Sequence, residues 1–335
     1  MRLRIFFHDK CFDGLSSAAV FSRFHRERIC GDAEHQFSGL VHRAGALFEE
    51  SKFDGDENAI VDFKYSASPR ITWWFDHHES AFLTAADSDH FQRELQLQQA
   101  NSARGVKPRK FYDPGFRSCT EFIASTAERV YGFDRSPLGE LIRWADIIDG
   151  ALYPDAKTAV EMQEPAMKLT MVVEATQDAG FAGRLIPLLA SRPLSEIIRE
   201  PFIAELVPPL LERHTASLEL LRRRAECRAR TVFFDITDQP MEGYNKFIPY
   251  YLHPGCIYSV GLSKSSFRVK VSVGSNPWVR EHDMVNLARI CERYGGGGHA
   301  RVGAISFDVS QAEAARAAAT EIVAELRDDQ RQKRC

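Results

Sequence analysis

Short, continuous apolar runs alternate with helical patterns along the first part of the chain. Three of these runs end directly in an acid or a histidine: residues 3–7 before His8, residues 59–61 before Asp62, and residues 71–75 before Asp76. Unbroken apolar runs of this length are typical of strands that are buried on both faces of a parallel sheet. We therefore predict an α/β fold with a doubly wound, mostly parallel sheet in this part of the chain.

The pattern changes after a long helical stretch. Residues 206–230 are rich in arginine, but glutamates are interleaved with the arginines at helical spacing, which favours a solvated connecting helix over a patch for nucleic acid. Residues 256–262 and 267–273 have the character of strands. We predict a second, smaller α+β domain. The predicted parts are a sheet domain, a helical connector and the α+β domain, at residues 1–155, 156–230 and 231–335.

Side chains that bind metals follow the predicted strands. Asp76, His77 and His78 form a triplet after one strand, while His8 and Asp62 occupy matching positions after two others. Parallel strands have their carboxyl ends at one edge of the sheet, where open α/β folds bind ligands. We therefore expect these side chains to converge on one site.

Two more carboxylates extend this predicted site. Asp13 follows His8 closely, and Asp146 follows the apolar stripe of a helix, although a carboxylate at an exposed helix end is the alternative interpretation of Asp146. The set suits octahedral Mn²⁺ or Mg²⁺ more than structural zinc, because it offers oxygen and nitrogen ligands without a sulfur cage. The predicted metal ligands are His8, Asp13, Asp62, His77 and Asp146. A shared Asp62 could bridge two cations that activate water, which predicts hydrolysis of a phosphoester.

Four consecutive glycines, residues 295–298, precede His299 and Arg301. They lie between a predicted helix and a predicted strand of one domain, whereas a flexible tether joins domains. Glycines in such a place let backbone amides approach an anion closely. The predicted substrate-binding residues are Gly296, Gly297, Gly298, His299 and Arg301.

Composition and charge limit where the protein can be located and which partners it can bind. A net charge of -3 gives no overall attraction to nucleic acid, so an anionic substrate must be held by local groups or bound cations. The seven cysteines form no CxxC pair, which argues against a disulfide framework or a zinc ribbon and favours reduced thiols. No apolar run is long enough for a secretory signal or a membrane span. We expect a cytoplasmic protein without a membrane partner.

Taken in order, these motifs resemble the DHH–DHHA1 phosphoesterase superfamily, which includes RecJ-type exonucleases, nanoRNases and cyclic-dinucleotide phosphodiesterases. The matching positions are residues 8–14, Asp62, residues 76–78, Asp146 and, as the GGGH signature, residues 295–304. The resemblance implies a hydrolase with two Mn²⁺ ions, or Mg²⁺, acting on a nucleotide or a short single-stranded oligonucleotide. It implies that Asp76 supports the metal ligands and that His78 lies near the substrate phosphate, so these two are the predicted catalytic residues. It leaves open whether the enzyme is a homodimer.

Two positions depart from the family pattern. Cys11 stands where many members have a second metal-binding aspartate, which leaves three interpretations open: Cys11 binds a softer metal, Asp9 substitutes, or one metal site is only partly filled. Residues 272–275 read Ser-Val-Gly-Ser where related nucleases often have Ser-Leu-Arg-Ser, so the usual arginine is missing. A pyrophosphatase or polyphosphatase, and a nucleotide-binding sensor of weak activity, are the alternative functions. The glycine run argues against the pyrophosphatase.

Overall fold

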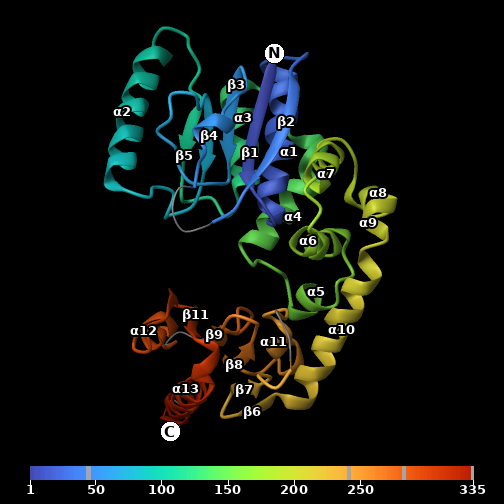
Figure 1. Cartoon of the computed structure of the whole chain (residues 1–335), viewed down its shortest axis with the longest axis vertical. Coiled ribbons are helices and arrows are strands. Elements are labelled where there is room, and N and C mark those ends of the chain that lie inside the picture. Colours follow the sequence, from blue (N-terminus) through green and yellow to red (C-terminus); the bar gives the residue numbers. More distant parts are fainter. Residues whose placement is uncertain (43–46, 240–242, 281–283, 333–335) are drawn as a thin grey trace. The chain divides into compact units, whose positions relative to one another are not determined.

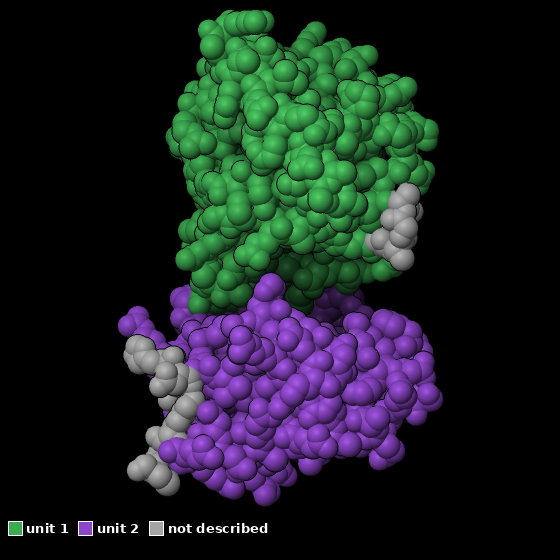
Figure 2. Space-filling model, turned by 90° about the vertical axis from the view of Figure 1, so that its left-hand side faces the viewer, with its two compact units in different colours: residues 1–153, 163–207 green, residues 154–162, 208–335 purple. Residues whose placement is uncertain are grey.

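The computed structural model describes residues 1–42, 47–239, 243–280 and 284–332 (Figure 1). The chain divides into two compact units (Figure 2): unit 1 comprises residues 1–153 and 163–207, and unit 2 comprises residues 154–162 and 208–335. The predicted helical connector, residues 156–230, is not a separate body. Its middle part packs with unit 1 and its two ends with unit 2.

Unit 1 is built on a five-stranded parallel sheet with the order β2-β1-β3-β4-β5. The strands are β1 (Arg2–His8), β2 (Glu34–Leu40), β3 (Glu57–Val61), β4 (Trp73–Asp76) and β5 (Lys110–Tyr112). The chain moves outward in one direction from β1 to β2 and in the other from β3 to β5. In sheets of this order, the carboxyl ends of β1 and β3 flank the crevice in which ligands bind.

Different elements cover the two faces of this sheet. Successive side chains of a strand point to opposite faces. The rings of Trp73 and Phe75 in β4 lie 5.6 and 5.9 Å from Phe21 of helix α1 (Phe12–Arg28). The ring of Trp74 between them lies 5.0 Å from Phe91 of helix α2 (Ala85–Ser102). All three β4 side chains are fully buried. Helices on both faces explain the unbroken apolar run, and the predicted doubly wound sheet is confirmed.

The helices of unit 1 pack around this sheet and beside one another. They are α1 (Phe12–Arg28), α2 (Ala85–Ser102), α3 (Cys119–Tyr131), α4 (Gly139–Asp149), α6 (Pro165–Ala175), α7 (Phe181–Leu189), α8 (Leu194–Ile197) and α9 (Pro201–Ala204). Helix α1 is buried along most of its length because its small residues allow close packing, and the hydroxyls of Ser17 and Thr120 of α3 lie 3.2 Å apart. In the described part of the chain, none of the helices combines the length and the apolar character that crossing a membrane requires.

Unit 2 contains a mixed sheet with the order β10-β11-β9-β8-β7-β6, in which only β7 and β8 are parallel. Its strands are β6 (Glu226–Arg228), β7 (Thr231–Asp235), β8 (Tyr258–Lys264), β9 (Val269–Ser275), β10 (Gly297–His299) and β11 (Val302–Phe307). Its helices are α5 (Ala156–Val160), α11 (Ile248–Leu252), α12 (Leu287–Glu292), α13 (Ala312–Gln332) and, starting at the unit boundary, α10 (Val207–Arg224).

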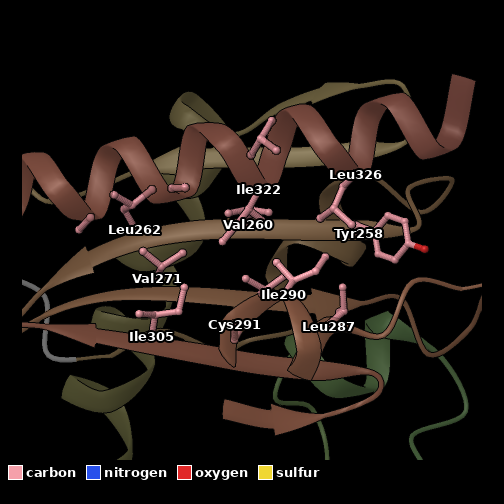
Figure 3. Packing of buried hydrophobic residues seen from close by; sticks show 14 of the residues in the cluster. Tyr258, Val260, Leu262, Val271, Leu287, Ile290, Cys291, Ile305, Ile322 and Leu326 are labelled. Atoms are coloured by element: carbon pink, nitrogen blue, oxygen red, sulfur yellow. The ribbon is translucent and has the colours of Figure 1, made fainter. Parts of the chain in front are cut away.

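One face of this second sheet carries an apolar core (Figure 3). Val260 of β8 and Val271 of β9 lie on it with Ile322 of α13 and Ile290 of α12, all in one buried cluster. The alternating pattern of β9, apolar inward and polar outward, is typical of a sheet with one buried face. The predicted α+β character of this region is confirmed.

Glu57, the first residue of β3, is the centre of a polar cluster far from the carboxyl ends of the strands. Its carboxylate accepts hydrogen bonds from His25 Nε2 at 3.1 Å, Trp73 Nε1 at 2.8 Å and Arg109 Nη1 at 2.6 Å. Burial alone would raise the pKa of Glu57, but the hydrogen bonds from His25, Trp73 and Arg109 and the positive charge of Arg109 outweigh it and lower this pKa to about 2. The folded state therefore favours the ionised carboxylate.

Replacing Glu57 with glutamine should destabilise unit 1 by about 3 kcal/mol at pH 7, because a pKa of about 2 in place of 4.5 corresponds to that free energy. The contribution is fully present above pH 4.5 and is lost as the pH falls toward 2, since the depressed pKa belongs to the folded state. Urea unfolding of both proteins at pH 7, 5 and 4 measures it. The difference in the free energy of unfolding between the wild-type protein and Glu57→Gln should begin to narrow near pH 4. The control Glu79→Gln, at an exposed position, should unfold with the same free energy as the wild-type protein.

Candidate metal centre

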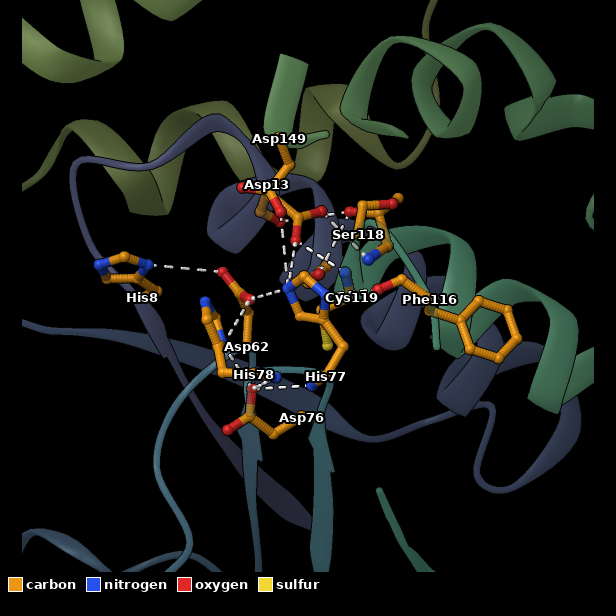
Figure 4. Close-up of polar contacts among 12 residues, drawn as sticks. His8, Asp13, Asp62, Asp76, His77, His78, Phe116, Ser118, Cys119 and Asp149 are labelled. Carbon is orange, nitrogen blue, oxygen red and sulfur yellow. Dashed lines mark hydrogen bonds and ion pairs between the residues drawn. The ribbon is translucent and has the colours of Figure 1, made fainter. Parts of the chain in front are cut away.

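The carboxyl ends of three neighbouring strands bring the predicted site together. His8 is the last residue of β1, Asp62 follows β3, and Asp76 ends β4 before His77. Asp62 has a φ of 56°, a left-handed conformation that aspartate tolerates better than most residues. Figure 4 shows these side chains pointing toward one another.

Asp62 lies at the centre of the cluster and is only 1% exposed. Its Oδ2 is 3.6 Å from His8 Nδ1, and its Oδ1 is 3.5 Å from His77 Nε2 and 3.9 Å from His78 Nδ1 (Figure 4). Burial by itself raises the pKa of Asp62, but the nearby imidazoles of His77, His8 and His78 outweigh it and lower this pKa. One carboxylate thus reaches three imidazoles.

His77 is oriented from behind by a backbone carbonyl. Its Nδ1 lies 3.0 Å from the oxygen of Phe116, which can only accept, so Nδ1 carries the proton of that hydrogen bond. Its Nε2 faces carboxylate oxygens of Asp13, Asp62 and Asp149 at 3.8, 3.5 and 3.6 Å. A carbonyl behind one ring nitrogen is the usual support of a metal-binding histidine.

The protonation of His77 reflects the negative charge around it. Burial alone lowers the pKa of His77, but Asp62 and Asp13 outweigh burial and raise it to about 10. Burial, together with Asp62 and Asp149, raises the pKa of Asp13. Within the described residues, Nε2 of His77 and Oδ1 of Asp62 are buried without a hydrogen-bond partner. Buried polar atoms ordinarily have partners, and a divalent cation fits here because it would satisfy both atoms and neutralise the carboxylates.

Asp13 reaches the centre because two helix starts meet there. The backbone N–H groups of Cys119 and Thr120, in the first turn of α3, donate to its two oxygens at 2.8 and 3.1 Å. Ser118 caps this helix by accepting from the N–H of Glu121, as the sequence suggests. Gly14 allows α1 to start directly against β1, since a Cβ at Gly14 would lie 2.0 Å from the His8 oxygen.

Asp76 orients the two histidines that follow it. Its Oδ1 accepts from the backbone N–H of His77 at 2.8 Å, from the backbone N–H of His78 at 3.2 Å and from the ring Nδ1 of His78 at 2.7 Å. The hydrogen bond that His78 donates to Asp76 also raises the pKa of His78. Asp76 is fully buried, and this geometry is that of a supporting residue.

Three overlapping groups of side chains could each hold a metal ion. In each group, one ligand atom per residue lies within 4.8 Å of the others, and the groups are His8–Cys11–Asp62, Asp62–His77–His78 and Asp13–His77–Asp149. Four of the five predicted metal ligands are therefore brought together. Asp62 belongs to two groups, which is the arrangement expected of a bridging carboxylate.

Asp146, the fifth predicted ligand, is replaced in this cluster by Asp149. Asp149 ends α4 and lies 3.6 Å from His77 Nε2, whereas Asp146, one turn earlier, accepts a hydrogen bond from Ser118 Oγ at 3.3 Å. Residues three apart share one helix face, so the sequence offers both acids equally. Asp149, at the end of α4, is the acid whose carboxylate lies 3.6 Å from His77 Nε2, so it joins the cluster in place of Asp146.

The first motif supplies a thiol in place of a second carboxylate. Asp9 accepts a hydrogen bond from the N–H of Lys10, and its side chain lies against Gly39 of β2, where an added Cβ would come within 2.6 Å of it. Asp9 belongs to none of the three groups, while Cys11 lies with His8 and Asp62. The interpretation in which Asp9 replaces the missing ligand is not supported by this geometry.

The glycine run of unit 2 forms a hairpin instead of an open loop. Residues Gly297–His299 make β10, which pairs antiparallel with β11. A Cβ at Gly296 would lie 2.3 Å from the Ala304 oxygen, and one at Gly298 would lie 2.2 Å from the Val302 oxygen. Close packing against β11 therefore also requires glycine at positions 296 and 298.

His299 and Arg301, which follow the run, are both exposed. The Arg301 guanidinium donates to the Asn276 oxygen at 3.2 Å. The hairpin thus presents a ring nitrogen and a positive charge to solvent.

Comparisons by sequence find no relative: no family model and no curated protein matches this chain. Solved structures do match. A pGpG-specific phosphodiesterase, PggH, from Vibrio cholerae has a TM-score of 0.65 at 19% identity, over 96% of this chain and 99% of that chain. A DHH domain described as a member of the s1p family of ribosomal proteins has a TM-score of 0.59 at 13% identity, over 97% of this chain and 87% of that chain. An exopolyphosphatase-related protein from Bacteroides fragilis has a TM-score of 0.51 at 12% identity, over 98% and 93%. At such identities the likeness shows the fold, and the DHH-type fold expected from the motifs is confirmed.

Proposed function

We propose, from this shared fold and this cluster, that the chain is a metal-dependent phosphoesterase that hydrolyses phosphoester bonds of nucleotides or short single-stranded oligonucleotides. The observation that carries the proposal is the pair of buried, unpartnered ligand atoms, Asp62 Oδ1 and His77 Nε2, among further carboxylates at the strand ends. Such a cluster needs cations, and cations in an open α/β site suit phosphate.

The residues of the cluster have separate roles. His8, Asp13, Asp62, His77 and Asp149 would hold two divalent cations, Mn²⁺ by preference and Mg²⁺ as the alternative, and Cys11 belongs to the group formed with His8 and Asp62. Bound cations supply an activated water and neutralise phosphoryl oxygens. Asp76 holds the Nδ1 side of His78, whose side chain is 38% exposed, so its other ring nitrogen is available to donate a hydrogen bond to a substrate phosphate.

The hairpin of unit 2 carries groups suited to binding a nucleotide substrate. Exposed His299 and Arg301 suit a phosphate or a base edge, and the glycines give the backbone close access. The cytoplasmic location remains a prediction from the sequence.

The first substrate to test is a linear dinucleotide such as pGpG, because a structure of the same fold is that of a pGpG-specific phosphodiesterase. The panel should contain pGpG, a cyclic dinucleotide, short single-stranded RNA and DNA, a nucleoside bisphosphate, pyrophosphate and polyphosphate, each with Mn²⁺ or Mg²⁺ and with products identified by mass. Release of mononucleotides supports the proposal. Turnover of pyrophosphate or polyphosphate alone would replace it with the phosphatase alternative, and tight nucleotide binding without turnover would indicate a sensor.

Replacing His299 with alanine should raise KM about 10-fold or more with a smaller change in kcat, because the side chain is exposed in unit 2 and belongs to none of the metal groups. Steady-state kinetics on a substrate that this panel identifies measures this effect. Thr320→Ala, on the exposed surface of α13, is the matched control. Unchanged KM and kcat in the His299 variant would remove His299 from the site.

A further inference from the structure

We propose that Cys11 is a metal ligand and that its thiolate makes the centre a mixed one, with a thiophilic cation such as Zn²⁺, Co²⁺ or Fe²⁺ in one position and Mn²⁺ or Mg²⁺ in the other. This inference deepens the proposed function, on which it rests for the presence of two cations. It concerns which cation each position selects.

A thiol is not the side chain that the backbone position of Cys11 favours. It is the N-cap residue of α1, where serine, threonine, aspartate and asparagine are favoured because their oxygens accept a backbone hydrogen bond. The Cys11 side chain makes no such bond. A cysteine here therefore gives up the stabilisation that a capping residue contributes.

The geometry around Cys11 provides the rest of a ligand set. Ligand atoms of His8, Cys11 and Asp62 lie within 4.8 Å of one another. Asp62 is only 1% exposed; its Oδ2 lies 3.6 Å from His8 Nδ1, while its Oδ1, which has no hydrogen-bond partner among the described residues, faces His77. Asp9, the other acid of the motif, is turned toward Gly39. The thiol is thus the donor that completes this group.

The two ends of the cluster differ in chemical softness. His8, Cys11 and Asp62 supply nitrogen, sulfur and oxygen, whereas Asp13, His77 and Asp149 supply only nitrogen and oxygen. Thiolates select softer cations, and carboxylate-rich sets suit Mn²⁺ and Mg²⁺. When the sulfur binds a cation, the thiol releases its proton to solvent, so the step is a proton-for-metal exchange without a change of oxidation state.

Cobalt absorption distinguishes sulfur from oxygen ligands without reference to activity. The metal-free full-length protein is titrated anaerobically with Co²⁺, and a sulfur-to-cobalt charge-transfer band is expected in the near ultraviolet. Cys11→Ser should lose this band, while Cys30→Ser, a thiol that instead donates to Asp32, should keep it. Cys119→Ser is a second control, because the buried Cys119 thiol donates to the Phe75 oxygen at 3.5 Å.

Metal analysis provides the second measurement. After dialysis against Zn²⁺ with Mn²⁺ in large excess, which offsets the generally stronger binding of Zn²⁺, the wild-type protein should hold one of each. In Cys11→Asp, the preference for Zn²⁺ over Mn²⁺ at the position formed by His8, residue 11 and Asp62 should be reduced by about 10-fold or more. Absence of the band, or its loss in Cys119→Ser but not in Cys11→Ser, would overturn the inference. A sulfur band in a protein that hydrolyses no phosphoester supports the ligand assignment and refutes the proposed function. Hydrolysis of a phosphoester by a protein that lacks the band supports the proposed function and refutes the ligand assignment.

Discussion

Replacing Asp62 with asparagine should lower kcat/KM for the phosphoester substrate by about 10³-fold or more, which corresponds to roughly 4 kcal/mol of transition-state stabilisation. Asp62 reaches His8, His77 and His78 and belongs to two of the three ligand groups. Its loss should therefore weaken both metal positions together. Metal content measured after dialysis should fall along with the rate.

Asparagine is the informative replacement because it keeps the size of the side chain and tolerates the φ of 56° at this position, whereas alanine adds backbone strain. Circular dichroism and thermal unfolding should show that the fold survives. Asp89→Asn, at an exposed position on α2, is the matched control and should be fully active. Full activity and full metal content in Asp62→Asn would refute the bridging role of this carboxylate.

Removal of divalent cations by a chelator should abolish hydrolysis, and Mn²⁺ should restore it. In the metal-free protein, Asp13, Asp62 and Asp149 all face Nε2 of His77, and burial together with the other two carboxylates raises the pKa of Asp13, so the negative charge around Asp13 is poorly compensated. A cation that binds only the folded state stabilises it. Added Mn²⁺ should therefore raise Tm in the wild-type protein, and much less in Asp62→Asn.

The metal affinity should also rise with pH. The pKa of His77 is raised to about 10, so this imidazole is protonated in the metal-free protein throughout the neutral range. A cation must displace this proton, and proton competition weakens as the pH increases toward 10. Calorimetric titration with Mn²⁺ at pH 6.5, 7.5 and 8.5, with proton release followed in buffers of different ionisation enthalpy, measures this effect. Activity that survives exhaustive chelation, or an affinity independent of pH, would contradict the metal site as described.

The pattern of apolar runs was sufficient to place His8, Asp62 and Asp76 at strand ends, because a buried strand shows its limits where polar residues begin. Their meeting at one edge of the sheet then follows from the rule that parallel strands place their carboxyl ends together. The helix cap at Ser118 can also be recognised from the sequence, because it depends on residues close together in the chain. These features are local or periodic, and an amino-acid sequence records such features directly.

Other features depend on contacts that no local pattern contains. Asp13 is held by the N–H groups of Cys119 and Thr120, more than a hundred residues away. Similarly, the choice of Asp149 over Asp146 depends on how far the end of α4 reaches toward His77, although both acids occupy one helix face.

The sequence by itself determined the parallel sheet, the strand ends and the kinds of ligand that gather there. Only the tertiary structure decided that Asp9 turns to Gly39 while Cys11 stays with His8, and that the glycines form a hairpin. The physical reason is the same in each case: the direction of a side chain at a turn is set by what packs against it, and the residues that pack there come from distant parts of the chain.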